Sequence, residues 1–166
     1  MIKNLLISLF ISTFVVSSSY AAGSSDSGSS KTKTKYDMAV THIKAAKNFE
    51  KKDKLEKAKK SYLKAQTLLV QSNKNFPNKA DTLNYLGFTT RKLGDFENGE
   101  KFYLQGLKID PKHAGINEYL GELYVATDRH NLAVERLEVL KDCNCKEYDQ
   151  LKACLLYTSP SPRDRG

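Results

Sequence analysis

Large apolar side chains recur every three or four positions along the chain from about Tyr36 onward, with charged and polar residues between them. This spacing is that of one face of an α-helix. Around the middle of the chain, a first stripe consists of Leu83, Leu86, Phe88, Thr90 and Leu93. A second stripe follows after a Gly94–Asp95 break and consists of Phe96, Phe102, Tyr103, Leu107 and Ile109. The pattern therefore predicts an all-α fold built from helix-turn-helix pairs.

The residues between the stripes have the chemistry of helix ends. Gly94 suits the left-handed position that follows a helix, and Asp95 suits the N-cap of the next one. Pro111 is expected to end the second helix, and Asp110 beside it is expected to cap the start of the third pair. The turn residues thus agree with the helix boundaries that the stripes predict.

The pattern repeats at a fixed interval. Tyr85–Leu86–Gly87 recurs as Tyr119–Leu120–Gly121 exactly where a 34-residue period places it, and Asp128–Arg129 follows Gly94–Asp95 at the same offset. Small residues at Gly87, Gly99 and Gly106 are expected where the backbone of a partner helix presses close. A repeat of this length indicates stacked hairpins that share one continuous core.

The repeat resembles the tetratricopeptide family, whose 34-residue unit carries W-x2-L-G-x2-Y, then A-x3-F-x2-A, then P. In a unit that starts at Ala80, these positions hold Leu83, Leu86, Gly87, Thr90, Gly99, Tyr103, Gly106 and Pro111. The next unit, from Ala114, matches more loosely, with Leu140 at a normally small position and Cys145 in place of the Pro. The resemblance implies a right-handed superhelical stack of about three units over residues 36–153.

An earlier unit appears once an insertion is allowed. Ala46 and Ala58 precede Gly87 and Gly99 by 41 residues, which is seven more than the period. Seven residues make about two helical turns, so the second helix of this unit can lengthen without rotating its apolar face. A helix of roughly 20 residues is predicted before Pro77.

The two ends of the chain differ from this repeat. Residues 1–21 combine Lys3, an apolar stretch from Leu5 to Val16 and small residues up to Ala21, as in a cleaved signal peptide with its cleavage site near Ala21 or Ala22. An uncleaved membrane anchor is the alternative, although the apolar stretch is short for a bilayer span. Residues 22–35 are rich in Gly, Ser and Lys and are expected to form a flexible linker.

The last residues, 154–166, lose the helical period and turn to Ser, Pro and Arg. The segment resembles the translated read-through of a sequencing adapter, and an ordinary disordered terminus is the alternative. Lys146 to Ala153 is expected to begin a capping helix or a shortened fourth unit. We assign no functional role to the final segment.

The charge of the chain is concentrated in one half. The net charge is +8, but residues 31–79 carry +10 and residues 80–147 carry −3. The lysine-rich run from Lys44 to Lys64 also contains Glu50, Asp53 and Glu56, and favours a solvated helix laced with salt bridges. Its alternative role is peripheral contact with an anionic membrane surface or an acidic partner. Nucleic acid is not expected, since no aromatic platform accompanies the lysines.

Residues suited to catalysis or cofactor binding form no recognisable motif. His42, His113 and His130 are scattered, and the sequence has no phosphate-binding Gly-rich loop, so we expect no enzyme activity, cofactor or metal. Cys143 and Cys145 are close enough in sequence to form a disulfide, because an exported protein reaches a compartment in which disulfides persist. Such a bridge either staples the end of the third unit or has a redox role, with Cys154 as another pairing partner.

The resemblance also implies a groove lined by the first helix of each unit. Its predicted lining consists of Lys47, Asp81, Asn84, Tyr85, Phe88, Arg91, Glu118, Tyr119 and Glu122. An amide, aromatic faces and a guanidinium suit an extended peptide or a helix, whereas the alternative is a solvated face with Phe88 packed. A two-Lys, two-Asn, one-Arg clamp for a C-terminal carboxylate, known in some members, is missing.

Together these features predict an exported, non-catalytic scaffold in the periplasm that binds a peptide or protein partner through this groove. The alternative function is a periplasmic thiol-redox accessory protein that uses Cys143 and Cys145.

Overall fold

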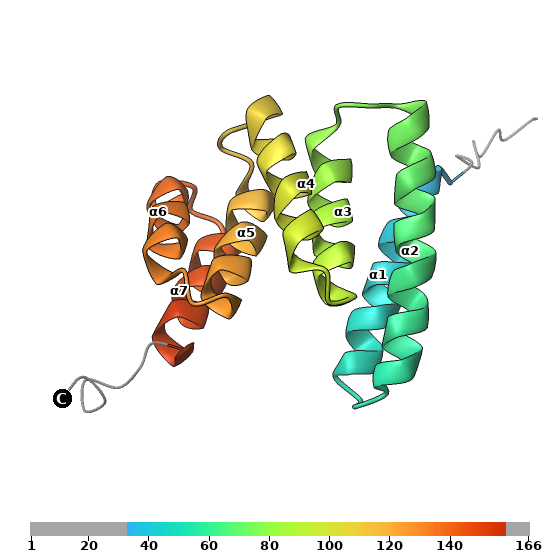
Figure 1. Ribbon diagram of the computed structural model, residues 1–166, viewed down its shortest axis with the longest axis horizontal. Coiled ribbons are helices and arrows are strands. Elements are labelled where there is room, and N and C mark those ends of the chain that lie inside the picture. Colours follow the sequence, from blue (N-terminus) through green and yellow to red (C-terminus); the bar gives the residue numbers. More distant parts are fainter. Residues whose placement is uncertain (1–32, 159–166) are drawn as a thin grey trace, which may run out of the picture. The chain divides into compact units, whose positions relative to one another are not determined.

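The computed structural model describes residues 33–158, which contain seven α-helices and, within that range, no strand. The helices are α1 (Lys35–Glu50), α2 (Leu55–Asn75), α3 (Ala80–Lys92), α4 (Phe96–Ile109), α5 (Ala114–Ala126), α6 (His130–Leu140) and α7 (Lys146–Thr158) (Figure 1). The predicted all-α fold is therefore confirmed. The predicted signal peptide, nearly all of the predicted linker and the last eight residues lie outside the described residues.

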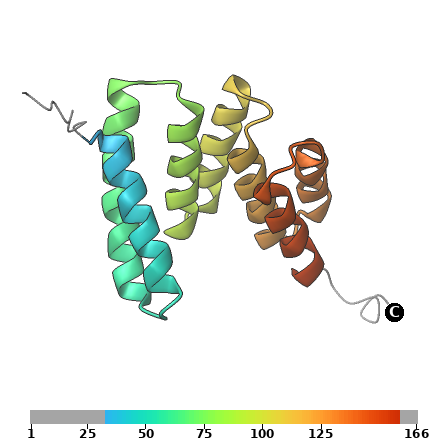
Figure 2. The same cartoon turned by 180° about the vertical axis from the view of Figure 1, so that it is seen from behind.

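The helices pack in sequential pairs. The most extensive contacts join α1 with α2, α3 with α4 and α5 with α6, and each pair then packs on the next. Figures 1 and 2 show the same order from opposite sides, with the α1–α2 and α5–α6 pairs flanking the α3–α4 pair. The predicted helix-turn-helix pairs are confirmed in all three units.

The seventh helix packs on α5 and α6, as the first helix of a further pair would. It continues to Thr158, whereas the repeat region was predicted to end at residue 153. The difference has a packing cause. Leu151 is fully buried, and Cys154 and Leu155 extend its contact with the core around α5.

Two hydrophobic clusters hold the stack together. The first lies between α1, α2 and α3 and includes Ile43, Tyr62 and Leu86. The second lies among α4, α5 and α6 and includes Tyr103 and Leu120. Tyr119 packs against both clusters, so the two are continuous through α5.

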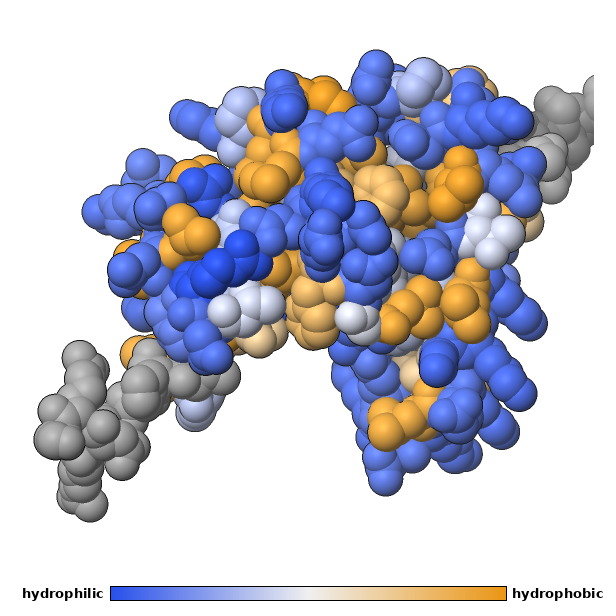
Figure 3. Space-filling model, viewed as in Figure 1, coloured by the Kyte–Doolittle hydropathy of each residue, from blue (hydrophilic) through white to orange (hydrophobic). Residues whose placement is uncertain are grey.

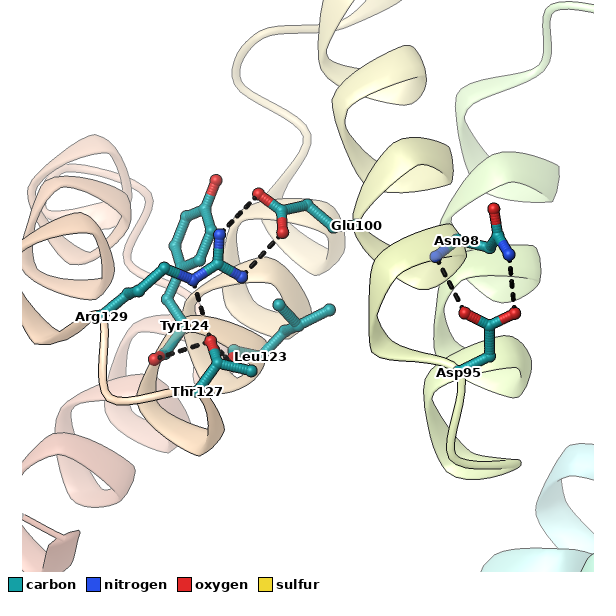
Figure 4. A network of polar contacts seen from close by, with 7 residues as sticks. All are labelled: Asp95, Asn98, Glu100, Leu123, Tyr124, Thr127 and Arg129. Carbon is teal, nitrogen blue, oxygen red and sulfur yellow. Dashed lines mark hydrogen bonds and ion pairs between the residues drawn. The ribbon is translucent and has the colours of Figure 1, made fainter.

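The turn within each helix pair uses a left-handed residue. Gly94 has φ +99°, as predicted, and Asp53 and Asp128 have φ +53° and +56° at the corresponding positions of the other pairs. Asp95 then caps α4, as also predicted: its Oδ1 accepts a hydrogen bond from the Asn98 backbone N–H at 3.0 Å, and its Oδ2 accepts one from the Asn98 side chain at 2.7 Å (Figure 4).

The prediction that Asp110 caps the third pair is wrong. The N-cap of α5 is His113, whose Nδ1 accepts a hydrogen bond from the Ile116 N–H at 3.2 Å. Asp110 lies too early, at the C-cap of α4, where its side chain accepts from the Lys112 N–H at 3.2 Å. The other ring nitrogen of His113, Nε2, faces Asp81 Oδ1 at 3.1 Å.

The small residues permit close approach, but in two different ways. A Cβ at Gly99 would lie 3.2 Å from the carbonyl oxygen of Gly87 and 3.3 Å from the Arg91 nitrogen, so the backbones of α3 and α4 meet there as predicted. At Gly87 and Gly106, by contrast, a Cβ would collide with the side chains of Tyr103 and Ile116. Those two glycines make room for core side chains, because large residues of the neighbouring helix fill the space.

The lengthened helix of the first unit is confirmed, since α2 has 21 residues. The prediction of a salt-bridged helix from Lys44 to Lys64 is wrong. The run is split by the turn between α1 and α2, and among the described residues its lysines form no ion pair with Glu50, Asp53 or Glu56. Glu50 instead pairs with Lys92 of α3, at 2.7 Å. The tip of this hairpin projects as a mainly hydrophilic surface with a small hydrophobic patch (Figure 3).

A guanidinium clamp joins the second unit to the third. Arg129, at the α5–α6 turn, donates two hydrogen bonds to the Glu100 carboxylate of α4, at 3.0 and 2.7 Å, and a third to the Thr127 hydroxyl at 2.9 Å (Figure 4). Its guanidinium carbon also lies 4.6 Å from the centre of the Tyr124 ring. A bidentate pair of this kind fixes geometry as well as adding stability.

Candidate functional site

Side chains from the first helices of three successive units converge at one place. Lys47 comes from α1, Phe88 and Arg91 come from α3, and Tyr119 and Glu122 come from α5. We call these five residues the first-helix cluster. The Lys47 Nζ donates a hydrogen bond to the Tyr119 hydroxyl at 3.0 Å and lies 4.5 Å from the centre of the Phe88 ring. The cluster thus spans the stack from the first unit to the third.

Aromatic contacts form the floor of the cluster. The Phe88 ring lies 4.7 Å from that of Tyr119 and 5.8 Å from that of Tyr62, centre to centre. Lys47 covers Phe88 from above, in the arrangement of a cation–π contact. As a result Phe88 is only 3% exposed.

A charged pair lies beside these rings. Arg91 donates a hydrogen bond to Glu122 at 2.6 Å, with side chains that are 11% and 27% exposed. Burial by itself would lower the pKa of Arg91, but the neighbouring Tyr103 and Glu122 outweigh it and raise the pKa. The guanidinium therefore stays charged and is held in a fixed orientation, and only 11% of the side chain is exposed.

Glu118 lies close to this pair and is 3% exposed. Burial raises the pKa of its carboxyl to about 8, and the negative charges of Glu122 and Glu147 act in the same direction. Lys47 and Lys146 oppose the rise without cancelling it. At neutral pH the group is mainly protonated, so it can donate a hydrogen bond as well as accept one.

The nine predicted groove residues occupy three kinds of position: three are buried, five are half-buried and Asp81 is exposed. Asn84, Phe88 and Glu118 are buried and form the floor, so they do not present the exposed lining that was predicted for them. Half-buried positions with access to solvent are occupied by Lys47, Tyr85, Arg91, Tyr119 and Glu122. For Phe88 the cause is that Lys47 reaches across from the first unit and covers its ring.

Asp81 lies apart from the cluster, at the start of α3, where it contacts His113. Tyr85, on the same helix, packs against Tyr36 at a ring distance of 5.9 Å. Asp81 therefore lies at the starts of α3 and α5, and Tyr85 packs at the start of α1.

Sequence reasoning missed Tyr62 and Lys92, which extend the cluster toward the hairpin tip. The Tyr62 hydroxyl donates to Glu50 at 2.9 Å, and the same carboxylate holds Lys92. Tyr62 carried a signal, because it corresponds to the core residue Tyr103 at the 41-residue offset. That signal indicates burial and does not reveal the hydrogen bond to another helix.

The cysteine pair is not on a helix of the cluster. Cys143 and Cys145 are joined by a disulfide with an S–S distance of 1.97 Å, in the turn between α6 and α7. Cys154 is outside this bridge, half-buried on α7. Residues 33–158 contain no group of three or more His, Cys, Asp or Glu side chains arranged to hold a metal ion. None of the helices in that range combines the length and apolar character that a membrane span needs.

Comparison with known families identifies a helical repeat. The tetratricopeptide repeat profile matches residues 80–113, which are α3, α4 and the connection to α5. The match begins at the residue from which the second unit was counted in the sequence. No curated protein matches the chain.

Proposed function

Because residues 80–113 are a tetratricopeptide repeat, we propose that this chain is a non-catalytic scaffold that binds a peptide or protein partner on the first-helix cluster. Stacked repeats of this kind create extended binding surfaces, since each unit adds one helix to a shared face. The proposed partner is a peptide or a protein. The proposed site is the part of this shared face where charged and aromatic groups reach solvent.

The observation that carries the proposal is the Arg91–Glu122 pair, held at 2.6 Å beside the Lys47–Tyr119 hydrogen bond. The two cations and the phenol are already oriented by neighbours, so little side-chain entropy is lost when a partner binds. These half-buried side chains carry N–H and O–H donors of the kind that bind the backbone carbonyls and carboxylates of an extended segment. Phe88 contributes by supporting the rings from below.

We also propose export to the periplasm. The support is the signal-peptide pattern of residues 1–21 and the presence of a disulfide, a bond that persists in oxidising compartments. Mass spectrometry of the protein recovered from its own cells tests this, because cleavage near Ala21 gives a defined N-terminus. An intact Met1 would contradict export by this route.

The binding site is tested by chemical crosslinking and pull-down of the chain from its own cells. The Lys47→Gln and Glu122→Gln variants remove charge from the cluster with little change in size, and they should recover less partner by about tenfold. Lys101→Gln is the matched control, since Lys101 is exposed and its ion pair with Glu97 lies on α4. If both cluster variants recover the same partners as the control in the same amounts, the cluster is not the binding site.

A further inference from the structure

A second surface lies where the chain departs from its 34-residue period. A pocket of about 580 Å³ opens between the start of α1, the end of α2 and the start of α3. The residues that line it come from the beginning of the described chain and from the two helix ends that the α2–α3 connection joins. It shares no residue with the first-helix cluster. Its volume is within the range of ligand-binding pockets.

The pocket is a consequence of the extra length of α2. With 21 residues, α2 is longer than α4, which has 14, and its last turn extends to Asn75. The chain must then return to the start of α3 through residues 76–79, and it leaves a space that no side chain of the described residues fills. In the α3–α4 pair, by contrast, the two helices have nearly equal lengths of 13 and 14 residues.

The pocket combines an apolar surface with a basic rim. Tyr36 and Phe76 supply aromatic area, and Phe76 is 64% exposed, which is unusual for so large an apolar side chain. Lys33, Lys35 and Lys79 stand around them, against the single carboxylate of Asp81. The pocket wall therefore carries a net positive charge next to an apolar surface.

The start of α3 adds a further preference for negative charge. Its N-cap residue is Lys79, which makes no side-chain capping hydrogen bond. The start of α1, on the other side of the pocket, is fully capped by Thr34 in a capping box with Asp37. The first N–H groups of α3 thus lack the side-chain acceptor that a helix start usually has, and a carboxylate from a ligand can supply one.

We propose that this pocket binds an acidic segment of a partner protein, in which an apolar side chain packs on Phe76 and Tyr36 while flanking carboxylates pair with Lys33, Lys35 and Lys79. Charge complementarity selects this occupant. A neutral apolar segment would leave three lysines unpaired, and a fully polar acidic segment would leave Phe76 exposed. The site is independent of binding at the first-helix cluster.

The test is fluorescence anisotropy of the full chain with a labelled short peptide of alternating glutamate and leucine. Saturable binding is expected, weakened about tenfold or more when glutamine replaces glutamate or serine replaces leucine in the peptide. The Phe76→Ser and Lys79→Glu variants should lose affinity by a similar factor. Both residues are exposed, so neither change removes a core contact.

Lys64→Glu is the matched control, because Lys64 is an exposed lysine on α2 that does not line the pocket. It should bind the peptide as the unchanged protein does. Equal affinity of all variants, or no preference for glutamate over glutamine, would overturn the proposal. Concentration-dependent self-association that Lys79→Glu abolishes would also overturn the proposal. Binding to phosphatidylglycerol vesicles in place of the peptide would overturn it too, if Lys79→Glu abolishes that binding. Loss of peptide binding with the Lys47→Gln variant alone would assign the peptide to the first-helix cluster instead.

Discussion

Asp53, Gly94 and Asp128 adopt the left-handed backbone at equivalent turns, but the residue that follows each of them differs. The N-caps of α2, α4 and α6 are Lys54, Asp95 and Arg129, and of these only Asp95 makes a side-chain capping hydrogen bond. The backbone at Lys54, with φ −98° and ψ 61°, is close to that at Asp95, with φ −95° and ψ 85°. At the residue scale, the turn of the first unit therefore has the backbone geometry of an N-cap, but the Lys54 side chain has no acceptor for the capping hydrogen bond.

The Lys54→Asp variant should for this reason be more stable than the unchanged protein, by about 1 kcal/mol in the free energy of unfolding. The new carboxylate would accept a hydrogen bond from the start of α2 and would interact favourably with its dipole. Urea unfolding followed by circular dichroism measures the change. Asp95→Ala is the opposite control and should lose about as much. A Lys54→Asp variant that is less stable than wild type would show that the α2 turn does not accept a cap.

Glu118 gives a pH dependence with a definite sign. Its pKa rises from 4.5 to about 8 in the folded state because it is buried. Between these values the folded chain holds about one proton more than the unfolded chain, so stability falls as pH rises through that window. Below the window both states hold the proton, and above it both have lost it.

Glu118→Gln should remove this slope and should stabilise the protein more at pH 9 than at pH 4, since it keeps the buried group neutral. Denaturant unfolding at a series of pH values measures it. Glu138→Gln, at an exposed position on α6, is the control and should leave the slope unchanged. The same slope in Glu118→Gln and in wild type would mean that the carboxyl is not shielded from water.

At the scale of the helices, glycine decides where a neighbour can dock. Gly121 on α5 faces Leu151 of α7, and a Cβ there would lie 2.5 Å from a Leu151 methyl group. Leu151 is fully buried. The Leu151 side chain of α7 therefore packs into the space that Gly121 leaves on α5, and this contact helps to hold α7 in place.

A double-mutant cycle tests this pairing. Gly121→Ala should destabilise the protein through the clash, and Leu151→Ala should cost about 2–4 kcal/mol through the cavity it leaves. Combined, the two changes should cost less than the sum, because the new methyl group occupies part of the cavity. The free energy of unfolding of the four proteins gives the coupling. Strict additivity would show that α7 does not rest on Gly121.

For the molecule as a whole, the core consists of two clusters that meet at Tyr119. We therefore expect the two ends of the stack to unfold with different free energies. Each unit contacts mainly its neighbours, so stability in such proteins is a sum of local terms. The α1–α2 pair is held by the first cluster, and α5 with α6 by the second.

Leu123→Ala should therefore lower amide protection in α5, α6 and α7 while leaving most of the protection in α1 and α2. Hydrogen exchange measured by mass spectrometry resolves these segments. Leu69→Ala, at an equally buried position of the first cluster, should show the reverse pattern. A uniform loss of protection in both variants would indicate a single cooperative unit.

Much of this architecture was predictable because it depends on residues close in sequence. Apolar spacing and turn residues indicated the helices, Gly94 and Asp95 were correctly assigned, and the seven-residue insertion correctly predicted a long α2. The wrong cap at Asp110 arose from the same local reasoning, because α5 begins three residues after Pro111, with His113 as its N-cap. The end of α7 was missed because Leu151, Cys154 and Leu155 show a contact with α5 only once the fold is formed.

The candidate site was predictable only in outline. Position within the repeat indicated which residues share a face, and those of the first-helix cluster do meet. Whether each side chain is exposed or covered depended on a neighbour far away in the chain. Lys47 buries Phe88 and holds Tyr119, which is 72 residues away, and no local pattern encodes that contact.

The sequence by itself determined the helices, their pairing and the period of the stack, because hydrogen bonds within a helix and contacts between adjacent helices link residues close along the chain. The tertiary structure alone decided which side chains of the first-helix cluster stay accessible, the raised pKa of Glu118 and the basic pocket beside Phe76. Each of these follows from desolvation and charge contributed by helices of different units, and such effects exist only when the units are stacked.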